Sequence, residues 1–137
     1  MENVNKLICA LIALQNFCKD IHYNSKGDAF YSKHLLVDRV QENIGEYIDR
    51  IKEVFFLAAD KEPLKSGEYL KKSAELIPDI AENDRESFER LKDLLIKTMK
   101  QTEKLSKLTK GEENLIGAVA EDLQNSLGLV NRQVKDE

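Results

Sequence analysis

The sequence predicts an all-α protein, folded as a four-helix bundle with a short helix in the long connection between the second and third helices. Four long segments carry apolar residues at alternating intervals of three and four, the pattern of a helix with one buried face. The chain has only six glycines and two prolines and is 34% charged, a composition that suits helices better than strands. Its 137 residues are expected to form one domain, residues 1–137, with a buried core.

The first two helices are expected on either side of a short turn. The first covers residues 4–24, and Gly27 suits the left-handed backbone that often follows a helix end. Asp28 is placed to cap the second helix, which has no proline until after Ala59 and is expected to run without a break. Phe30 and Tyr31, near its start, are interpreted as packing residues. The two buried seams are Val4, Leu7, Leu11, Leu14, Cys18 and Ile21 in the first helix, and Val37, Val40, Ile44, Tyr47, Ile51, Val54 and Ala58 in the second.

The connection that follows Pro63 is expected to contain a helix of its own. Ser66 is placed to cap a short helix over residues 67–74, with Tyr69 and Leu70 as its buried residues. Two helices, a connection of about 20 residues and two more helices are the arrangement of a bundle with a long crossover.

The third helix is expected to open with a capping box, because Asn83 is followed three residues later by Glu86. Lys110 and Gly111 are expected to end it. The apolar face of the third helix is Phe88, Leu91, Leu95, Met99 and Leu105, and that of the fourth is Ile116, Ala120, Leu123, Leu127, Val130 and Val134.

Charge and cysteine content narrow the class of protein. The net charge of −4 argues against nucleic-acid binding by the folded body and mildly favours metal cations. No apolar run reaches the roughly 18 residues of a transmembrane helix, and the N-terminal segment has one basic residue, Lys6, and no cleavage signal. Cys9 and Cys18 lack the spacing of a redox or zinc motif and are predicted to be buried, reduced thiols. These features predict a cytoplasmic protein.

Four candidate metal ligands lie on one side of the second helix. His34 and Asp38 are four residues apart and share a face, as do Asp49 and Glu53. At about 100° per residue, all four fall within a sector roughly 100° wide, turned roughly 120° from the helix's own buried seam. The candidate ligands therefore face away from the core of their own bundle.

A single ion cannot reach both pairs in one chain. Asp38 and Asp49 are eleven residues apart, or about 16 Å of helix axis, whereas a metal–ligand bond is about 2 Å. Two antiparallel copies of the helix would place His34 and Asp38 of one chain against Asp49 and Glu53 of the other. Gly45 lies close to the midpoint and allows two backbones to approach closely. We therefore predict a metal site built across a two-fold axis.

The residues around these ligands resemble a known family. His22-Tyr23-Asn24-Ser25-Lys26-Gly27 is similar to the H-W-N-x-K-G turn of Dps, the ferritin-like DNA-binding proteins from starved cells. In that family a second His, an Asp, and then an Asp and a Glu follow at fixed intervals. His22, His34, Asp38, Asp49 and Glu53 reproduce these intervals of 12, 4, 11 and 4 residues. Residues 63–70 also resemble the family's small helix, and the resemblance covers residues 7–130.

The resemblance implies a ferritin-like bundle and a homo-oligomer, with two-fold dimers that assemble into a hollow shell, usually a dodecamer. It implies ferroxidase centres with His22, His34 and Asp38 from one subunit and Asp49 and Glu53 from its two-fold partner. The family oxidises Fe(II), in many members preferring hydrogen peroxide to dioxygen, and stores the ferric iron inside the shell. This activity protects against oxidative stress. Imidazole and carboxylate ligands suit iron as Fe(II) and Fe(III), and they also allow zinc or manganese.

The chain departs from the family in two places. Tyr23 stands where the family commonly has Trp, which keeps an oxidisable ring beside the first ligand. Members that bind DNA often use a Lys/Arg-rich tail, and neither end of this sequence has one. The absent basic tail and the net charge of −4 argue against DNA binding.

Two further interpretations concern the surface. The lysines at positions 97, 100, 104, 107 and 110 are spaced as a helix face, which we interpret as a solvated face and not as a basic stripe for a partner. The alternative to an iron-storing enzyme is a ferritin-like assembly or binding module, for DNA or a protein partner, with a weak or structural metal site.

Overall fold

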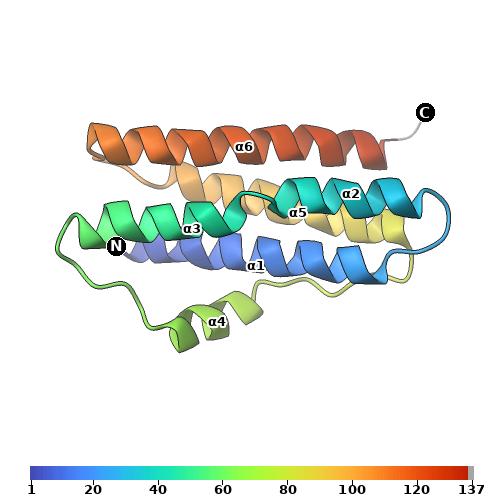
Figure 1. Cartoon of the computed structure of the whole chain (residues 1–137), viewed down its shortest axis with the longest axis horizontal. Helices are drawn as coiled ribbons and strands as arrows, with labels where there is room; N and C mark the ends of the chain where they lie inside the picture. The colour runs from blue at the N-terminus through green and yellow to red at the C-terminus, as the bar shows by residue number, and fades with distance from the viewer. Residues whose placement is uncertain (136–137) are drawn as a thin grey trace.

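The computed structural model describes residues 1–135, and helices are the only regular secondary structure in that range (Figure 1). This confirms the predicted all-α class. Asp136 and Glu137 of the C-terminal tail lie outside the described residues. Within residues 1–135, no helix is both long and apolar enough to cross a membrane. The helices are α1 (Glu2–Asn24), α2 (Phe30–Gln41), α3 (Ile44–Lys52), the π-helix η1 (Glu53–Leu57), α4 (Ser66–Ala74), α5 (Asp84–Glu103) and α6 (Lys110–Val134).

Four helical rods lie side by side around one apolar core. One rod is the succession of α2, α3 and η1, and the others are α1, α5 and α6 (Figure 1). α1 contacts α2, α3 and α5, and α6 contacts α5, α2, α3 and η1, so each rod has two neighbours. In Figure 1, α1 and α6 run in one direction, whereas the α2–α3 rod and α5 run in the other. The connection that carries α4 therefore travels along the bundle, packed against α1.

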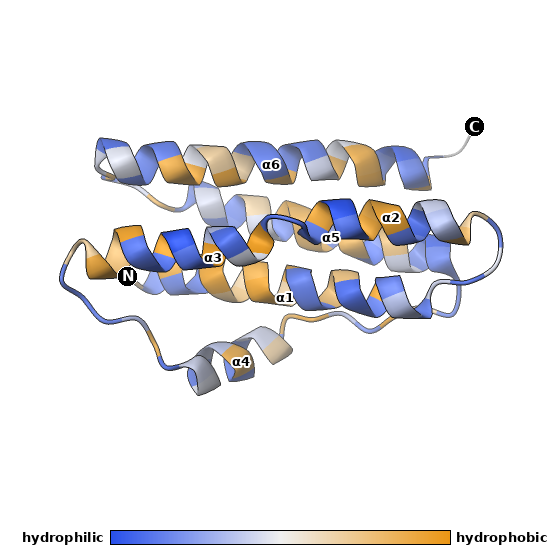
Figure 2. Ribbon diagram, in the orientation of Figure 1, coloured by the Kyte–Doolittle hydropathy of each residue, from blue (hydrophilic) through white to orange (hydrophobic). Residues whose placement is uncertain are grey.

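α1 contributes the largest share of the core. All six residues of its predicted seam are at most 4% exposed, and Ile8 and Phe17 beside the seam are fully buried as well. α1 therefore buries more than one face, because α4 covers it on a side that the other rods leave open. The remaining rods alternate apolar and polar residues along their length, as Figure 2 shows for α2, α3 and α6.

The second predicted helix is interrupted, so the expectation of a continuous helix is wrong. α2 ends at Gln41 and α3 begins at Ile44. Between them Asn43 adopts φ −102° and ψ 0°, outside helical geometry, and its side chain donates a hydrogen bond to Asp122 Oδ2 of α6 at 3.4 Å. Asparagine and glycine both have low helix propensity, so Asn43 and Gly45 favour a break at this point.

The end of this rod is a π-helix, which changes which residues are buried. The Ala58 N–H donates to the Glu53 carbonyl at 2.9 Å, a bond that spans five residues where an α-helix spans four. The wider turn rotates the residues that follow. Phe55 and Phe56 are buried, whereas Ala58, which the regular spacing placed in the core, is exposed.

Two predicted caps are also wrong. The N-cap of α2 is Ala29, not Asp28, and it has a left-handed backbone with φ 57° and no side-chain hydrogen bond. Gly27 does adopt the predicted left-handed conformation, with φ 79°. The N-cap of α4 is Lys65, so Ser66 is the first helical residue and makes no cap.

α4 is present as predicted, but only one of its two expected core residues is buried. Tyr69 is 1% exposed, and its hydroxyl donates to Asn5 Oδ1 of α1 at 2.7 Å and accepts from the Leu64 N–H at 3.2 Å. Leu70 is 61% exposed. Because Tyr69 fills the contact with α1, its neighbour points away from it.

α5 begins at the predicted N-cap but ends earlier than predicted. Asn83 Oδ1 accepts a hydrogen bond from the Glu86 N–H at 2.8 Å, as expected. α5 ends at Glu103 and not at Lys110, which is the first residue of α6. α6 starts with a capping box in which the Glu112 N–H donates to Thr109 Oγ1 at 3.2 Å and the Thr109 N–H donates to Glu112 Oε1 at 2.9 Å. Lys110 and Gly111, which were predicted to end the third helix, are therefore the first two residues of α6.

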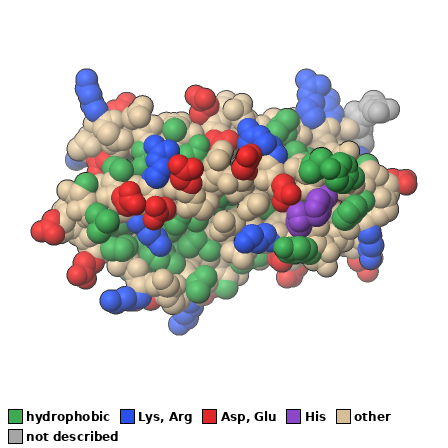
Figure 3. Space-filling model, viewed as in Figure 1, with side chains coloured by type: hydrophobic (Ala, Val, Ile, Leu, Met, Phe, Trp, Pro, Cys, Tyr) green, Lys and Arg blue, Asp and Glu red, His purple; other side chains and the backbone are tan. Residues whose placement is uncertain are grey.

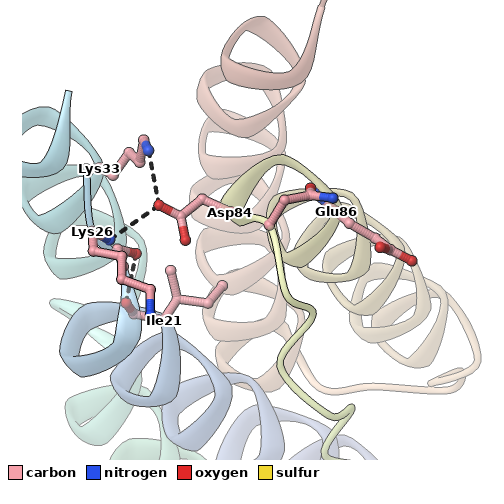
Figure 4. Close-up of polar contacts among 7 residues, drawn as sticks. Ile21, Lys26, Lys33, Asp84 and Glu86 are labelled. Carbon is pink, nitrogen blue, oxygen red and sulfur yellow. Dashed lines mark hydrogen bonds and ion pairs between the residues drawn. The ribbon is translucent and has the colours of Figure 1, made fainter. Parts of the chain in front are cut away.

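Asp84, in the first turn of α5, holds the turn between α1 and α2 (Figure 4). Its Oδ2 atom accepts a hydrogen bond from the Lys26 backbone N–H at 3.2 Å and pairs with Lys33 Nζ at 2.8 Å. The side chains of Lys33 and Asp84 are only 14% and 18% exposed. A charge pair this far removed from solvent is stable only as a pair, because either member alone would be desolvated without compensation.

We predict that Asp84→Asn lowers the free energy of unfolding by about 2 kcal/mol, because it leaves the Lys33 ammonium mostly buried without its anion. Urea denaturation of the metal-free protein measures this. Asp93→Asn is the matched control, since Asp93 is an exposed carboxylate on the same helix and should change stability by a few tenths of a kcal/mol at most. Equal effects of the two substitutions would contradict this role for Asp84.

Candidate metal centre

His22, His34 and Asp38 form a cluster that the turn between α1 and α2 brings together. His22 is in the last turn of α1, whereas His34 and Asp38 are one helical turn apart on α2. One ligand atom from each lies within 4.8 Å of the others, and all three residues are half-buried. It is the only such group of potential metal ligands within residues 1–135. In Figure 3 the histidines lie at the surface beside an acidic side chain.

The closest contact in the cluster joins His22 Nδ1 and Asp38 Oδ1, at 3.0 Å. The two atoms do not have the geometry of a hydrogen bond, and His22 Nδ1 is buried without another partner among the described residues. Two ligands at right angles around one ion, each with a bond of about 2.1 Å, are separated by about 3 Å. The spacing therefore fits two ligands aimed at a shared cation.

His34 is held in a defined orientation. Its Nδ1 atom lies 3.3 Å from the His22 carbonyl oxygen and donates to it in the tautomer that carries the proton on Nδ1. That tautomer leaves the Nε2 lone pair free, which is how a metal-binding histidine is usually oriented by a backbone carbonyl. The two imidazole rings also stack, with centroids 3.6 Å apart and planes 31° apart.

Asp49 and Glu53, the other two predicted ligands, do not join this cluster. Asp49 lies on α3 and Glu53 opens η1, beyond the interruption at Asn43, and both are exposed. The structure therefore brings together three of the five predicted residues. The remaining two stay a prediction for a neighbouring copy.

Large apolar side chains surround the cluster and are exposed. Tyr23 and Tyr31 are 77% and 70% exposed, and Phe30 and Leu35 are 40% and 46% exposed. The Tyr23 ring lies 4.9 Å from that of His22, and the Phe30 ring lies 5.3 Å from that of His34. Figure 3 shows hydrophobic side chains on several sides of the histidines. The interpretation of Phe30 and Tyr31 as packing residues is therefore wrong within this chain.

The sequence reading missed this apolar rim because it looked for residues that pack inside the bundle. A signal was present, since Phe30 precedes His34 by four residues and shares its face of α2. Leu35 directly follows His34. Their positions beside a candidate ligand, and not in the Val37–Val40 seam, marked them as surface residues.

Cys18 lies one helical turn before His22 on α1 and is completely buried. Burial raises the pKa of its thiol far above the ordinary value, and the negative charge of Asp38 raises it further. Burial also raises the pKa of Cys9, although a hydrogen bond with Ser73 and the charge of Lys72 oppose this. Both thiols are free, as predicted, and both are protonated near neutral pH.

We predict that Cys18 does not react with a thiol reagent in the folded protein at about pH 8, because its raised pKa leaves almost no thiolate and burial blocks access. Ellman's reagent, with and without denaturant, measures this. The Cys9→Ser variant isolates Cys18 and should react only after unfolding. Stoichiometric labelling of the folded variant would contradict the burial of this thiol.

No protein-family model matches the chain, and a search of curated proteins finds no match to it.

Proposed function

We propose that this chain is a Dps-like mini-ferritin, with a ferritin-like four-helix bundle, that oxidises Fe(II) at sites shared between two copies and stores the ferric product in a hollow shell. The observation that carries the proposal is the surface cluster of His22, His34 and Asp38, with a rim of exposed apolar side chains around it. A soluble chain seldom leaves aromatic rings exposed around a polar site unless another surface covers them. A second copy would cover this rim.

The incomplete ligand set supports a shared site. His22, His34 and Asp38 supply three ligands, which leaves an ion held by them with open coordination positions. Asp49 and Glu53 are exposed carboxylates on the same rod, past the interruption at Asn43. In an antiparallel pair of chains, the partner's Asp49 and Glu53 would complete the set, and the exposed Gly45 would lie near the axis.

Each residue then has a defined role toward the Fe(II) substrate. His34 binds through Nε2 while its Nδ1–H is held by the His22 carbonyl, and His22 and Asp38 bind beside it. The carboxylates stabilise the ferric product, because hard oxygen ligands favour the higher charge. Two Fe(II) ions give one electron each to hydrogen peroxide, the O–O bond breaks, and two protons from solvent complete two waters.

The oxidation test uses His34→Ala with Asp38→Ala. We expect this variant to lose nearly all peroxide-driven Fe(II) oxidation, because two of the three clustered ligands are gone, and to assemble as the wild type does. Absorbance of the ferric product measures the first, and sedimentation of the metal-free protein measures the second, with a dodecamer expected. The control is Asp20→Ala with Ser32→Ala, two exposed residues on the same helices. Undiminished oxidation in the double variant would refute the site, and a chain that remains monomeric would refute the shell.

A mixing experiment tests whether the site is shared. A second variant carries Asp49→Ala and Glu53→Ala, and each variant alone should be inactive. After joint refolding, about half of the two-fold dimers pair one variant with the other, and each such dimer has one site with all five ligands intact, which restores about a quarter of wild-type activity.

No recovery in the mixture, with both variants assembled, would show that each chain builds its site alone. Full activity of the Asp49→Ala, Glu53→Ala variant before mixing would show that these carboxylates are not ligands. Either result would refute the two-fold site while leaving the cluster on α1 and α2 in place.

A further inference from the structure

A groove with a volume of about 920 Å³ lies between the start of α1, the end of α4 and the C-terminal half of α5. It is separate from the metal cluster, and the inference below does not depend on the proposed function. Its floor includes apolar atoms of Ala10, Leu64 and Leu94. A groove of this size can take one small organic molecule.

The groove is basic although the chain is acidic. Five lysines line it, against the two carboxylates of Glu2 and Glu75, whereas the whole chain has a net charge of −4. The lysines are Lys6, Lys72, Lys97, Lys100 and Lys104. Lys6 pairs with Glu2 at 3.4 Å, but the other four make no ion pair with any carboxylate in residues 1–135. Four exposed lysines without an ion pair therefore line one half-open groove, in which Glu75 is the only carboxylate that is not already paired.

Lys97, Lys100 and Lys104 share one face of α5, within about 60° of one another, with Gln101 on the same side. Lysines near the end of a helix are favoured by its dipole, which accounts for cations in the last turn of α5. The dipole does not account for Lys6 and Lys72, which reach the same groove from α1 and α4. All five lysines of the run from Lys97 to Lys110 are exposed, as the interpretation of a solvated face expects, and three of them also line the groove.

Gln101 adds a second kind of recognition. Its Oε1 atom is buried and has no hydrogen-bond donor among the described residues, and the residue lines the groove. A buried acceptor without a partner costs free energy, which a ligand with a hydroxyl or amino group would recover once the Gln101 side chain turns its Oε1 atom into the groove. An inorganic anion would neutralise the lysines, but it has no organic hydroxyl or amino group to donate a hydrogen bond to Gln101.

We propose that this groove binds a small organic phosphate, such as a nucleotide, with its phosphates on Lys97, Lys100 and Lys72 and a hydroxyl or amino group donating to Gln101 Oε1. The lysine ammonium groups recognise the phosphates as point charges. The apolar floor contacts the organic part. A small ligand fits better than a nucleic-acid duplex because the groove is bounded by three helices and the rest of the chain is acidic.

The test is isothermal titration calorimetry of the full, metal-free chain with ATP, pyrophosphate and adenosine as probes. We expect saturable binding of ATP, weaker binding of pyrophosphate and none of adenosine. Lys97→Gln with Lys100→Gln should weaken ATP binding at least about tenfold, because two charge-assisted contacts are lost. The matched control, Lys61→Gln with Lys71→Gln, removes the same charge at exposed sites outside the groove and should leave binding within about twofold.

The Gln101→Leu variant distinguishes the contribution of the organic part of the ligand to affinity from that of its phosphates. It should weaken ATP about threefold or more and leave pyrophosphate unchanged, because only the organic part donates to Gln101. As an independent readout, ATP should protect Lys97 and Lys100, but not Lys71, from chemical acylation mapped by mass spectrometry.

Three results would overturn the proposal. ATP that shows no saturable binding would remove the site, and equal weakening by the groove and control variants would make the effect one of net charge. A short DNA duplex that binds through the same lysines more tightly than ATP would assign the groove to a nucleic-acid backbone.

Discussion

Asp84 joins the turn between α1 and α2 to the first turn of α5, through the Lys26 N–H and the Lys33 ammonium group. Lys33 directly precedes His34, and Lys26 follows His22 by four residues, so the same tether fastens the ends of the two histidine-bearing helices next to the cluster. Without it the turn would rest on local bonds, including that from the Phe30 N–H to the Gly27 carbonyl at 3.1 Å. The stacking of the imidazole rings and the 3.0 Å contact between His22 and Asp38 both depend on this geometry.

The helices and their buried faces were largely predictable because they follow from the local spacing of apolar residues. The seam of α1 and the first part of the seam of α2 and α3 follow the regular helical spacing, and all their residues up to Val40 and Ile44 are buried. The cluster was equally accessible, since His34 and Asp38 need only one helical turn to meet, and a short turn returns the chain to His22. The capping box of Thr109 and Glu112 was also readable, because a threonine followed three residues later by glutamate is its usual signal.

The features that escaped prediction depend on contacts distant in sequence. At the interruption, the Asn43 side chain donates a hydrogen bond to Asp122, which is 79 residues away in the sequence. No local sequence pattern indicates such a partner. Each hydrogen bond of a π-helix spans one residue more than in an α-helix, which moves Phe55 and Phe56 into the core although the apolar pattern fits either form. The basic groove combines lysines from α1, α4 and α5, so its charge is visible only once the chain is folded.

The cluster of His22, His34 and Asp38 also bears on the order in which the protein forms. All three residues belong to one hairpin of adjacent helices, and closing it joins positions only 12 residues apart. Short loops close with a small entropy cost, so contacts of this kind form early in folding, whereas the crossover that places α5 must wait. We expect a nascent hairpin to gather these three side chains before the bundle is complete. A divalent ion bound to the three side chains at that time would stabilise the hairpin and so favour folding.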